Sequence, residues 1–345
     1  MRKKLSEWEK GRDSVADFLK SDSEDIVLVP NVTTGIHSIL MSIPLKCGDA
    51  ILVTNQAFQA TNNSCAQILH HKGVQTKVVN ITLPIQDTAQ VLNMYREALD
   101  NDQNIQAVVI DYISCACAIQ LPVTEIVQLC QQYNTITVID CAHAPGQIPL
   151  KLEDMEADFL TGNFHKWMFA PWGCAFVWKN KKVTFPLRSL TSSSSKDDLE
   201  LQFCLQGTRD DSCYNSLSAA VEYIKNKGGH ERISEYNKRL LEMASNYLVS
   251  LWQTCKLPIP SSMEPPFLRM IRLPKIDNFG TSQEDANLLM DQMYNDHHID
   301  VCLKSVNSHL YVRLSVHIYN CLDDYKKFGE LIMSLAVNGR TKNLG

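Results

Sequence analysis

Strand-like and helix-like segments alternate along the first 140 residues, and this alternation restricts the fold more than any other feature. Short apolar runs have the length of strands, and the segments between them have helical spacing. The runs are 26–29, 50–54, 76–80, 107–110 and 136–140, and the expected helices are 37–43, 60–71, 88–99 and 123–133. Repeated β–α units predict an α/β fold with a mainly parallel sheet and helices on both faces.

The rhythm changes after about residue 225. A long helix is expected at 229–253, and the later elements are a strand at 268–273, a helix at 283–296, a strand at 311–315 and a helix at 322–336. A chain of 345 residues exceeds one typical core. We therefore predict a large domain over 20–225. The amphipathic N-terminal helix (1–19) is expected to join 226–345 in a smaller α+β domain.

Composition excludes several classes of protein. The net charge of −5 gives no reason to expect nucleic acid or an anionic membrane as a partner. No segment approaches the roughly 18 apolar residues of a membrane span, and the N-terminus lacks the apolar core of a signal peptide. The twelve cysteines are scattered, so free thiols and a cytoplasmic location are expected.

A carboxylate and a lysine stand where a cofactor site would form. Four apolar or β-branched residues lead directly into Asp140, as in a buried strand, and Lys166 follows a second apolar segment. Ligand sites in open α/β sheets form at the carboxyl ends of strands. Pyridoxal phosphate requires a lysine for a Schiff base and an acid for its pyridine nitrogen. The alternatives are a helix-capping Asp140 and a surface Lys166.

Five segments resemble motifs of the class V aminotransferases, and most of all their isopenicillin N epimerase-like branch. They are 31–35 (NVTTG), 140–146 (DCAHAPG), 161–176 (TGNFHKWMFAPWGCAF), 206–210 (QGTRD) and 313–320 (RLSVHIYN). Their order is that of the family, and the resemblance extends from near residue 20 to near residue 325. It implies a fold-type I pyridoxal phosphate enzyme that is a homodimer.

The resemblance also implies roles for individual residues. Lys166 would form the Schiff base and then remove the proton from the α-carbon, while Asp140 would bind the pyridine nitrogen. His143 would reach the phenolic oxygen of the ring, unless it is a core histidine bonded to backbone. Arg313 would bind the substrate carboxylate with its planar fork, unless it is a surface residue at a strand edge. Phe58 would pack near the ring, although core packing explains it equally well.

Further residues are implied as ligands of the phosphate. Thr33 and Thr34 open a helix whose free N–H groups favour an anion, although helix capping is the usual role of such threonines. Asn163 and His165 flank the lysine and correspond to two more contacts. Thr208 corresponds to a contact that the family donates across the dimer interface.

The chain departs from the family pattern in two places. Family members usually carry some tens of residues before this chain's first helix, including an Asn-His-Gly-like segment that lines the active site. Residues 113–122 contain Cys115 and Cys117 where the family has polar or rigid residues. Thiols are weaker hydrogen-bond partners than hydroxyls. Cys117 could be a reactive sulfur carrier, but isolated cysteines mostly pack as small hydrophobes.

These observations predict an enzyme that acts on a small-molecule amino acid. Epimerisation, elimination and transamination all begin with loss of the α-proton, and the sequence does not choose between them or name the substrate. The alternative is a catalytically impaired homodimer that binds pyridoxal phosphate, for want of the N-terminal segment. A third possibility, a dimeric scaffold that binds no cofactor, would leave all five motifs without a function. No metal site is expected, because the spacing of Cys115 and Cys117 does not fit the common zinc clamp.

Overall fold

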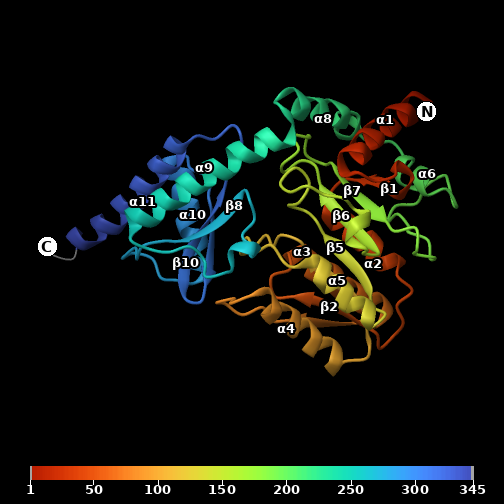
Figure 1. The fold of residues 1–345 in the computed structure, drawn as a ribbon, viewed down its shortest axis with the longest axis horizontal. Helices are drawn as coiled ribbons and strands as arrows, with labels where there is room; N and C mark the ends of the chain where they lie inside the picture. Colours follow the sequence, from red (N-terminus) through yellow and green to blue (C-terminus); the bar gives the residue numbers. More distant parts are fainter. Residues whose placement is uncertain (1, 343–345) are drawn as a thin grey trace. The chain divides into compact units, whose positions relative to one another are not determined.

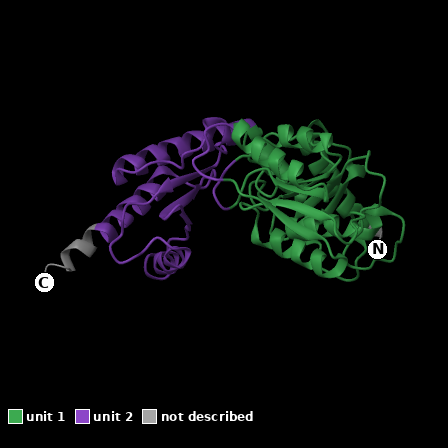
Figure 2. Ribbon diagram, turned by 90° about the horizontal axis from the view of Figure 1, so that it is seen from below, with its two compact units in different colours: residues 1–81, 88–115, 120–230 green, residues 82–87, 116–119, 231–345 purple. Residues whose placement is uncertain are grey.

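A computed structural model describes residues 2–342 (Figure 1). The chain forms two units, which are coloured separately in Figure 2. Unit 1 comprises the residues up to 81 together with 88–115 and 120–230. Unit 2 comprises 82–87, 116–119 and the residues from 231 onward.

Unit 1 is built on a seven-stranded sheet. In spatial order the strands are β1 (Ile26–Val29), β7 (Ala175–Lys179), β6 (Phe159–Asn163), β5 (Ile136–Asp140), β4 (Ile105–Asp111), β2 (Ala50–Thr54) and β3 (Gln75–Val79). The strands from β6 to β3 pair in parallel, whereas β7 runs antiparallel to both of its neighbours. The predicted α/β fold with a mainly parallel sheet is confirmed. The bounds of β2 and β5 agree with the predicted strands.

Helices precede, connect and follow the strands of this unit along the chain (Figure 1). They are α1 (Arg2–Leu19), α2 (Val32–Ser42), α3 (Gln59–Lys72), α4 (Thr88–Asn101), α5 (Val123–Gln132), α6 (Leu199–Cys204), α7 (Ser212–Asn215) and α8 (Leu217–Asn226), with short 3-10 turns at Ser23–Asp25 and Glu153–Met155. All residues of β2 are buried. Since successive strand residues face opposite sides, both faces of the sheet are covered at this point.

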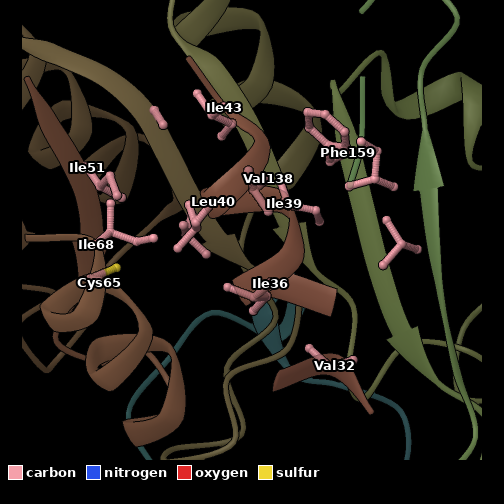
Figure 3. Packing of buried hydrophobic residues seen from close by; sticks show 14 of the residues in the cluster. Val32, Ile36, Ile39, Leu40, Ile43, Ile51, Cys65, Ile68, Val138 and Phe159 are labelled. Carbon is pink, nitrogen blue, oxygen red and sulfur yellow. The ribbon is translucent and has the colours of Figure 1, made fainter. Parts of the chain in front are cut away.

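Helix α2 is fixed to the sheet by an apolar stripe. Ile36, Ile39, Leu40 and Ile43 recur at the spacing of one helix face, and all are buried. Figure 3 shows them in one cluster with residues of the central strands, including Val138. The helix begins at Val32, five residues before the start that periodicity predicted, because Asn31 caps it. Its N-terminus is thereby held in a set position beside the sheet.

The placement of residues 1–19 in the smaller domain is wrong. Helix α1 belongs to unit 1, where it packs against α7, α8 and β1. Its apolar face is buried there, with Trp8, Val15 and Leu19 fully inaccessible. Amphipathic spacing shows that a helix buries one face but does not identify the surface that covers it.

Unit 2 contains a three-stranded antiparallel sheet in the order β8 (Leu268–Arg272), β10 (His309–Ser315), β9 (Cys302–Val306). Its helices are α9 (Gly229–Trp252), which begins in unit 1, α10 (Gln283–His297) and α11 (Leu322–Lys342), with a 3-10 turn at Ser261–Met263. This is the predicted C-terminal α+β arrangement. Among the helices of residues 2–342, none combines the length and hydrophobicity needed to cross a membrane.

Candidate active site

A cavity of about 220 Å³ lies in unit 1, at the carboxyl ends of β4 and β5 and beside the start of α2. Seven of the ten predicted site residues line it. They are Thr33, Phe58, Asp140, His143, Asn163, His165 and Lys166. These residues come from four separate segments of the chain, so the fold brings together what the sequence motifs predicted.

Lys166 reaches this cavity from the turn that follows β6. Its Nζ lies 3.0 Å from Nε2 of His143, a side chain that is itself buried. The neighbours Trp167 and Met168 are buried as well, which anchors the turn. An amine in hydrogen-bond contact with an imidazole can exchange a proton with it. The lysine therefore has a proton partner inside the cavity.

Asp140 ends β5 and is 6% exposed. Its Oδ1 accepts a hydrogen bond from the backbone N–H of Ala142 at 2.9 Å. Burial raises the pKa of this carboxyl, while the Ala142 N–H and the Lys166 ammonium act in the opposite direction. An ionised carboxylate at such a position needs a cation. A protonated pyridine nitrogen is a cation of suitable shape, so the residue fits the cofactor that the sequence predicts.

Asp111 is a cavity residue that the sequence analysis missed. It ends β4, lies next to Asp140 in the sheet register and also lines the cavity. Burial and the nearby Asp140 raise its pKa to about 7. The pattern that could have identified it is the same one that identified Asp140, an apolar run (107–110) that ends in an acid.

The start of α2 forms one wall of the cavity. Asn31 Oδ1 accepts hydrogen bonds from the N–H of Thr34 at 2.8 Å and from its hydroxyl at 3.0 Å. Asn163 Oδ1 accepts from the N–H of Val32 at 3.2 Å, which ties the end of β6 to the helix. Thr33 lines the cavity, whereas Thr34 lies outside its lining. A helix N-terminus of this kind favours an anion.

His165 is oriented by the backbone of the neighbouring strand. Its Nδ1 donates to the carbonyl of Cys174 at 3.1 Å. Burial lowers the pKa of the imidazole. Because Nδ1 carries the proton of the neutral ring, Nε2 is the remaining acceptor or, on protonation, a second donor. The side chain can therefore donate a hydrogen bond to an anion only when Nε2 is protonated as well.

Thr208 of unit 1 and Arg313 of unit 2, two of the predicted site residues, do not line the cavity of Lys166. Thr208 is exposed on the loop between α6 and α7 and does not line the cavity. Arg313 lies on β10 of unit 2, where it lines a cavity of about 370 Å³ together with Asp300 and Asp324. Phe58, although it lines the cavity of Lys166, remains 50% exposed at the start of α3.

The cysteines at and near the site are thiols. All twelve lie among the described residues and are free. Cys115 lines the cavity, whereas Cys117 is buried, and its burial raises the pKa to about 11. A thiol with so high a pKa is not a thiolate at neutral pH and is a poor nucleophile. This argues against a sulfur carrier at Cys117.

An acidic group elsewhere in unit 1 resembles a metal site. Asp22, Asp25 and Glu153 bring their carboxylates within 4.8 Å of one another. However, Lys181 forms ion pairs with both Asp22 and Asp25. An ammonium group therefore already compensates the charge that a metal ion would compensate.

Gly146 allows the loop after β5 to approach the lysine turn. Its φ is +78°, and a Cβ there would lie 2.7 Å from the carbonyl oxygen of Trp167. We expect Gly146→Ala to destabilise the fold and to displace Lys166, because both the backbone conformation and the contact are unfavourable. Gly48→Ala is the matched control, since Gly48 has φ +92° and open space around it.

Urea unfolding of the two variants separates these effects. Both variants have the cost of a left-handed backbone, and only Gly146→Ala adds the close contact with Trp167. We therefore expect Gly146→Ala to be less stable than Gly48→Ala by about 1–3 kcal/mol, the usual cost of overpacking. Equal stabilities would show that the loop and the lysine turn are not in close contact.

Comparisons with known proteins identify similar sequences along nearly the whole chain. A family model described as aminotransferase class-V matches residues 2–328. An L-cysteine desulfhydrase of Arabidopsis thaliana is 26% identical over 96% of this chain and 79% of that relative. Isopenicillin N epimerase of Amycolatopsis lactamdurans is 22% identical over 94% of this chain and 84% of the epimerase.

Solved structures share the fold. The cystine C–S lyase C-DES, solved in complex with its reaction product cysteine persulfide, superposes with a TM-score of 0.77. The match covers 97% of this chain and 88% of that one, at 16% sequence identity. At this identity the likeness concerns the fold.

Proposed function

Because this chain belongs to the class V aminotransferase family, whose enzymes use pyridoxal phosphate, we propose that it removes the α-proton of an amino acid and eliminates a sulfur group from the β-carbon. The observation that carries the proposal is the position of Lys166, whose Nζ shares one cavity with Asp140 and lies 3.0 Å from His143 Nε2. An amine base, a proton partner and a buried acid are the protein groups that this chemistry needs.

Pyridoxal phosphate, when bound, supplies an aldehyde that reacts with amines and a ring that accepts the electron pair left at the α-carbon. The residues present fit it. Asp140 would face the protonated nitrogen of the ring, and Lys166 would carry the cofactor before substrate arrives. Thr33 and Asn163, with the N-terminus of α2 and with His165 in its doubly protonated form, would hold the phosphate.

Lys166 then acts as the base. Its neutral Nζ takes the α-proton, and His143 can accept a proton from the resulting ammonium across the 3.0 Å contact. The carbon–sulfur bond at the β-carbon breaks as the leaving group departs as a thiol. With L-cysteine and water the products are pyruvate, ammonia and hydrogen sulfide, which balances all atoms without an oxidant. Arg313 would bind the substrate carboxylate.

Elimination is favoured over epimerisation and transamination by the relatives. The similarity to an L-cysteine desulfhydrase covers 96% of this chain at 26% identity, more than the 22% identity to isopenicillin N epimerase. The fold alone would support any of the three reactions.

The experiment is a product assay on purified protein supplied with pyridoxal phosphate. We expect sulfide and pyruvate in equal amounts from L-cysteine, or a thiol and pyruvate from an S-substituted cysteine. L-Alanine, which has no leaving group, is the control. Exchange of the α-proton without elimination would favour an epimerase. A cofactor spectrum that no amino acid perturbs would instead support an impaired binding protein.

We further propose a homodimer in which Thr208 serves the partner's site. This residue is exposed and lies outside the cavity of its own chain, as a residue donated to a partner would be. We expect Thr208→Ala to weaken cofactor binding by roughly 10–100-fold, because a hydrogen bond to a charged group contributes about 1.5–3 kcal/mol. Thr184→Ala, at another exposed threonine, is the control.

Light scattering and a cofactor titration test this pair of claims. A monomer, or a dimer whose cofactor affinity does not change in Thr208→Ala, would contradict the proposed role.

A further inference from the structure

Two carboxyl groups lie side by side on the floor of the cavity. Asp111 and Asp140 are Cα partners in the parallel pairing of β4 with β5. Partners in register on adjacent strands lie about 4.8 Å apart and project to the same side of the sheet. Both residues line the cavity, and they are only 4% and 6% exposed. Two ionised carboxylates at this separation and burial would repel each other strongly.

Hydrogen bonds distinguish the two groups. Asp111 Oδ2 accepts from the Thr54 hydroxyl at 3.3 Å. The Thr54 oxygen in turn accepts from the backbone N–H of Gln56 at 3.1 Å, so its own proton points to Asp111. Asp140 receives a backbone N–H through Oδ1. Each carboxyl group therefore has one oxygen bonded to protein and a second oxygen that can meet a further partner.

The ammonium group of Lys166, the cation in the cavity, stabilises the ionised form of only one of the two carboxyl groups. The Lys166 ammonium lowers the pKa of Asp140, but it is not among the causes that act on Asp111. A pyridinium bound to Asp140 would increase this asymmetry. One cation can compensate one carboxylate, so the second carboxyl group is more stable as the neutral acid.

We infer that Asp111 holds a proton and acts as the neutral partner of Asp140, a positioning residue that leaves Asp140 as the single anion of the cavity floor. The protonation state of Asp111 does not depend on the proposed function. Only its consequence for the binding of the ring nitrogen by Asp140 rests on that function. A neutral acid can donate a hydrogen bond to the neighbouring carboxylate without competing for the cation. Asp140 would thereby be held in place while it keeps its full charge for the ring nitrogen.

Other titratable groups surround the pair. Lys166, His143 and His165 face the cavity from the loops after β5 and β6, and Cys115 faces it from the loop after β4. Tyr95 of α4 is fully buried, and Asp111 contributes to raising its pKa. Cys141 follows Asp140, which also raises the pKa of that thiol. None of these groups other than the lysine and the histidines can supply a positive charge.

Infrared spectroscopy of the cofactor-free protein tests the inference directly. With isotope-labelled aspartate, we expect the carbonyl stretch of a protonated, buried aspartic acid at pH 6, decreasing as the pH rises through about 7. Asp111→Asn should lack this band. Thr54→Val should retain it with a higher midpoint, because the hydroxyl that stabilises the ionised form is gone. A wild-type protein without the band, or a band that survives in Asp111→Asn, would overturn the inference.

The pH dependence of stability gives a second readout. The folded-state pKa of Asp111 is raised above its unfolded value, so the folded state binds more protons between about pH 4 and about pH 7. Thermal stability should therefore fall as the pH rises through this range. We expect a shallower fall in Asp111→Asn, whose amide does not titrate. Equal slopes in the two proteins would contradict the assignment.

A cofactor titration separates the roles of the two acids. Asn is neutral and can still donate, so Asp111→Asn should bind pyridoxal phosphate within about threefold of the wild type. Asp140→Asn should bind far more weakly. Equal losses in both variants would mean that Asp111 is itself the anion. If the wild type binds no cofactor, the proposed function fails, and the infrared experiment still decides the state of Asp111.

Discussion

Replacing Lys166 with alanine is expected to abolish turnover and covalent attachment of the cofactor. The variant loses the amine that we propose carries the cofactor and takes the α-proton. Proton transfer by a positioned base alone contributes roughly 10²–10⁴-fold to a rate, so we expect a decrease of at least this size. The visible band of the lysine-bound cofactor should be absent, and borohydride reduction should leave the protein mass unchanged.

Two controls make this result specific. Lys182→Ala removes an exposed lysine and should leave both the spectrum and the rate unchanged. His143→Asn removes the proton partner at 3.0 Å from Nζ but keeps the amine, so it should slow turnover while covalent attachment persists. A Lys166→Ala protein that still gains the mass of the cofactor on reduction would show that another lysine carries it.

Replacing Asp140 with asparagine should be the second severe change. Asparagine has nearly the same shape but cannot compensate a pyridinium. Breaking one side of a buried ion pair costs about 3–5 kcal/mol, which corresponds to a loss of roughly 10²–10⁴ in cofactor affinity. We expect the rate with saturating cofactor to fall as well, because an unprotonated ring accepts electrons poorly.

Cofactor titration and the rate at saturation measure these two losses separately. Asp154→Asn alters an exposed carboxylate and should change neither quantity. Wild-type affinity and rate in Asp140→Asn would rule out a pairing of this carboxylate with the cofactor.

The parallel sheet could be predicted from the alternation of strands and helices, and seven residues that line the cavity could be predicted from local patterns together with the family resemblance. An apolar run that ends in an acid identified Asp140, and a lysine in a turn after the next strand identified Lys166. Asp111 has the same pattern, but its importance depends on the register of β4 against β5. Strand order and register arise from long-range pairing, which spacing along one segment does not encode.

Other outcomes depended on tertiary contacts for the same reason. The cap formed by Asn31 sets the start of α2 and turns the hydroxyl of Thr34 toward the cap, whereas the motif suggested equal roles for Thr33 and Thr34. Helix α1 has a clear apolar face, but only the structure shows that α7, α8 and β1 cover it. Periodicity finds buried faces, and packing decides their partners.

The antiparallel strand β7 has a consequence for repeated turnover. Segment 164–174 leaves the sheet at Asn163 and returns at Ala175, directly opposite in the register, and the N–H of Phe164 donates to the carbonyl of Cys174 at 3.0 Å. Both ends of segment 164–174, which carries Lys166, are therefore fixed at the same place on the sheet. In the proposed role of Lys166, the free amine would therefore stay at a high effective concentration beside the reacting carbon. The amine would then be positioned to bind the cofactor again after the product leaves, with no rearrangement of the backbone.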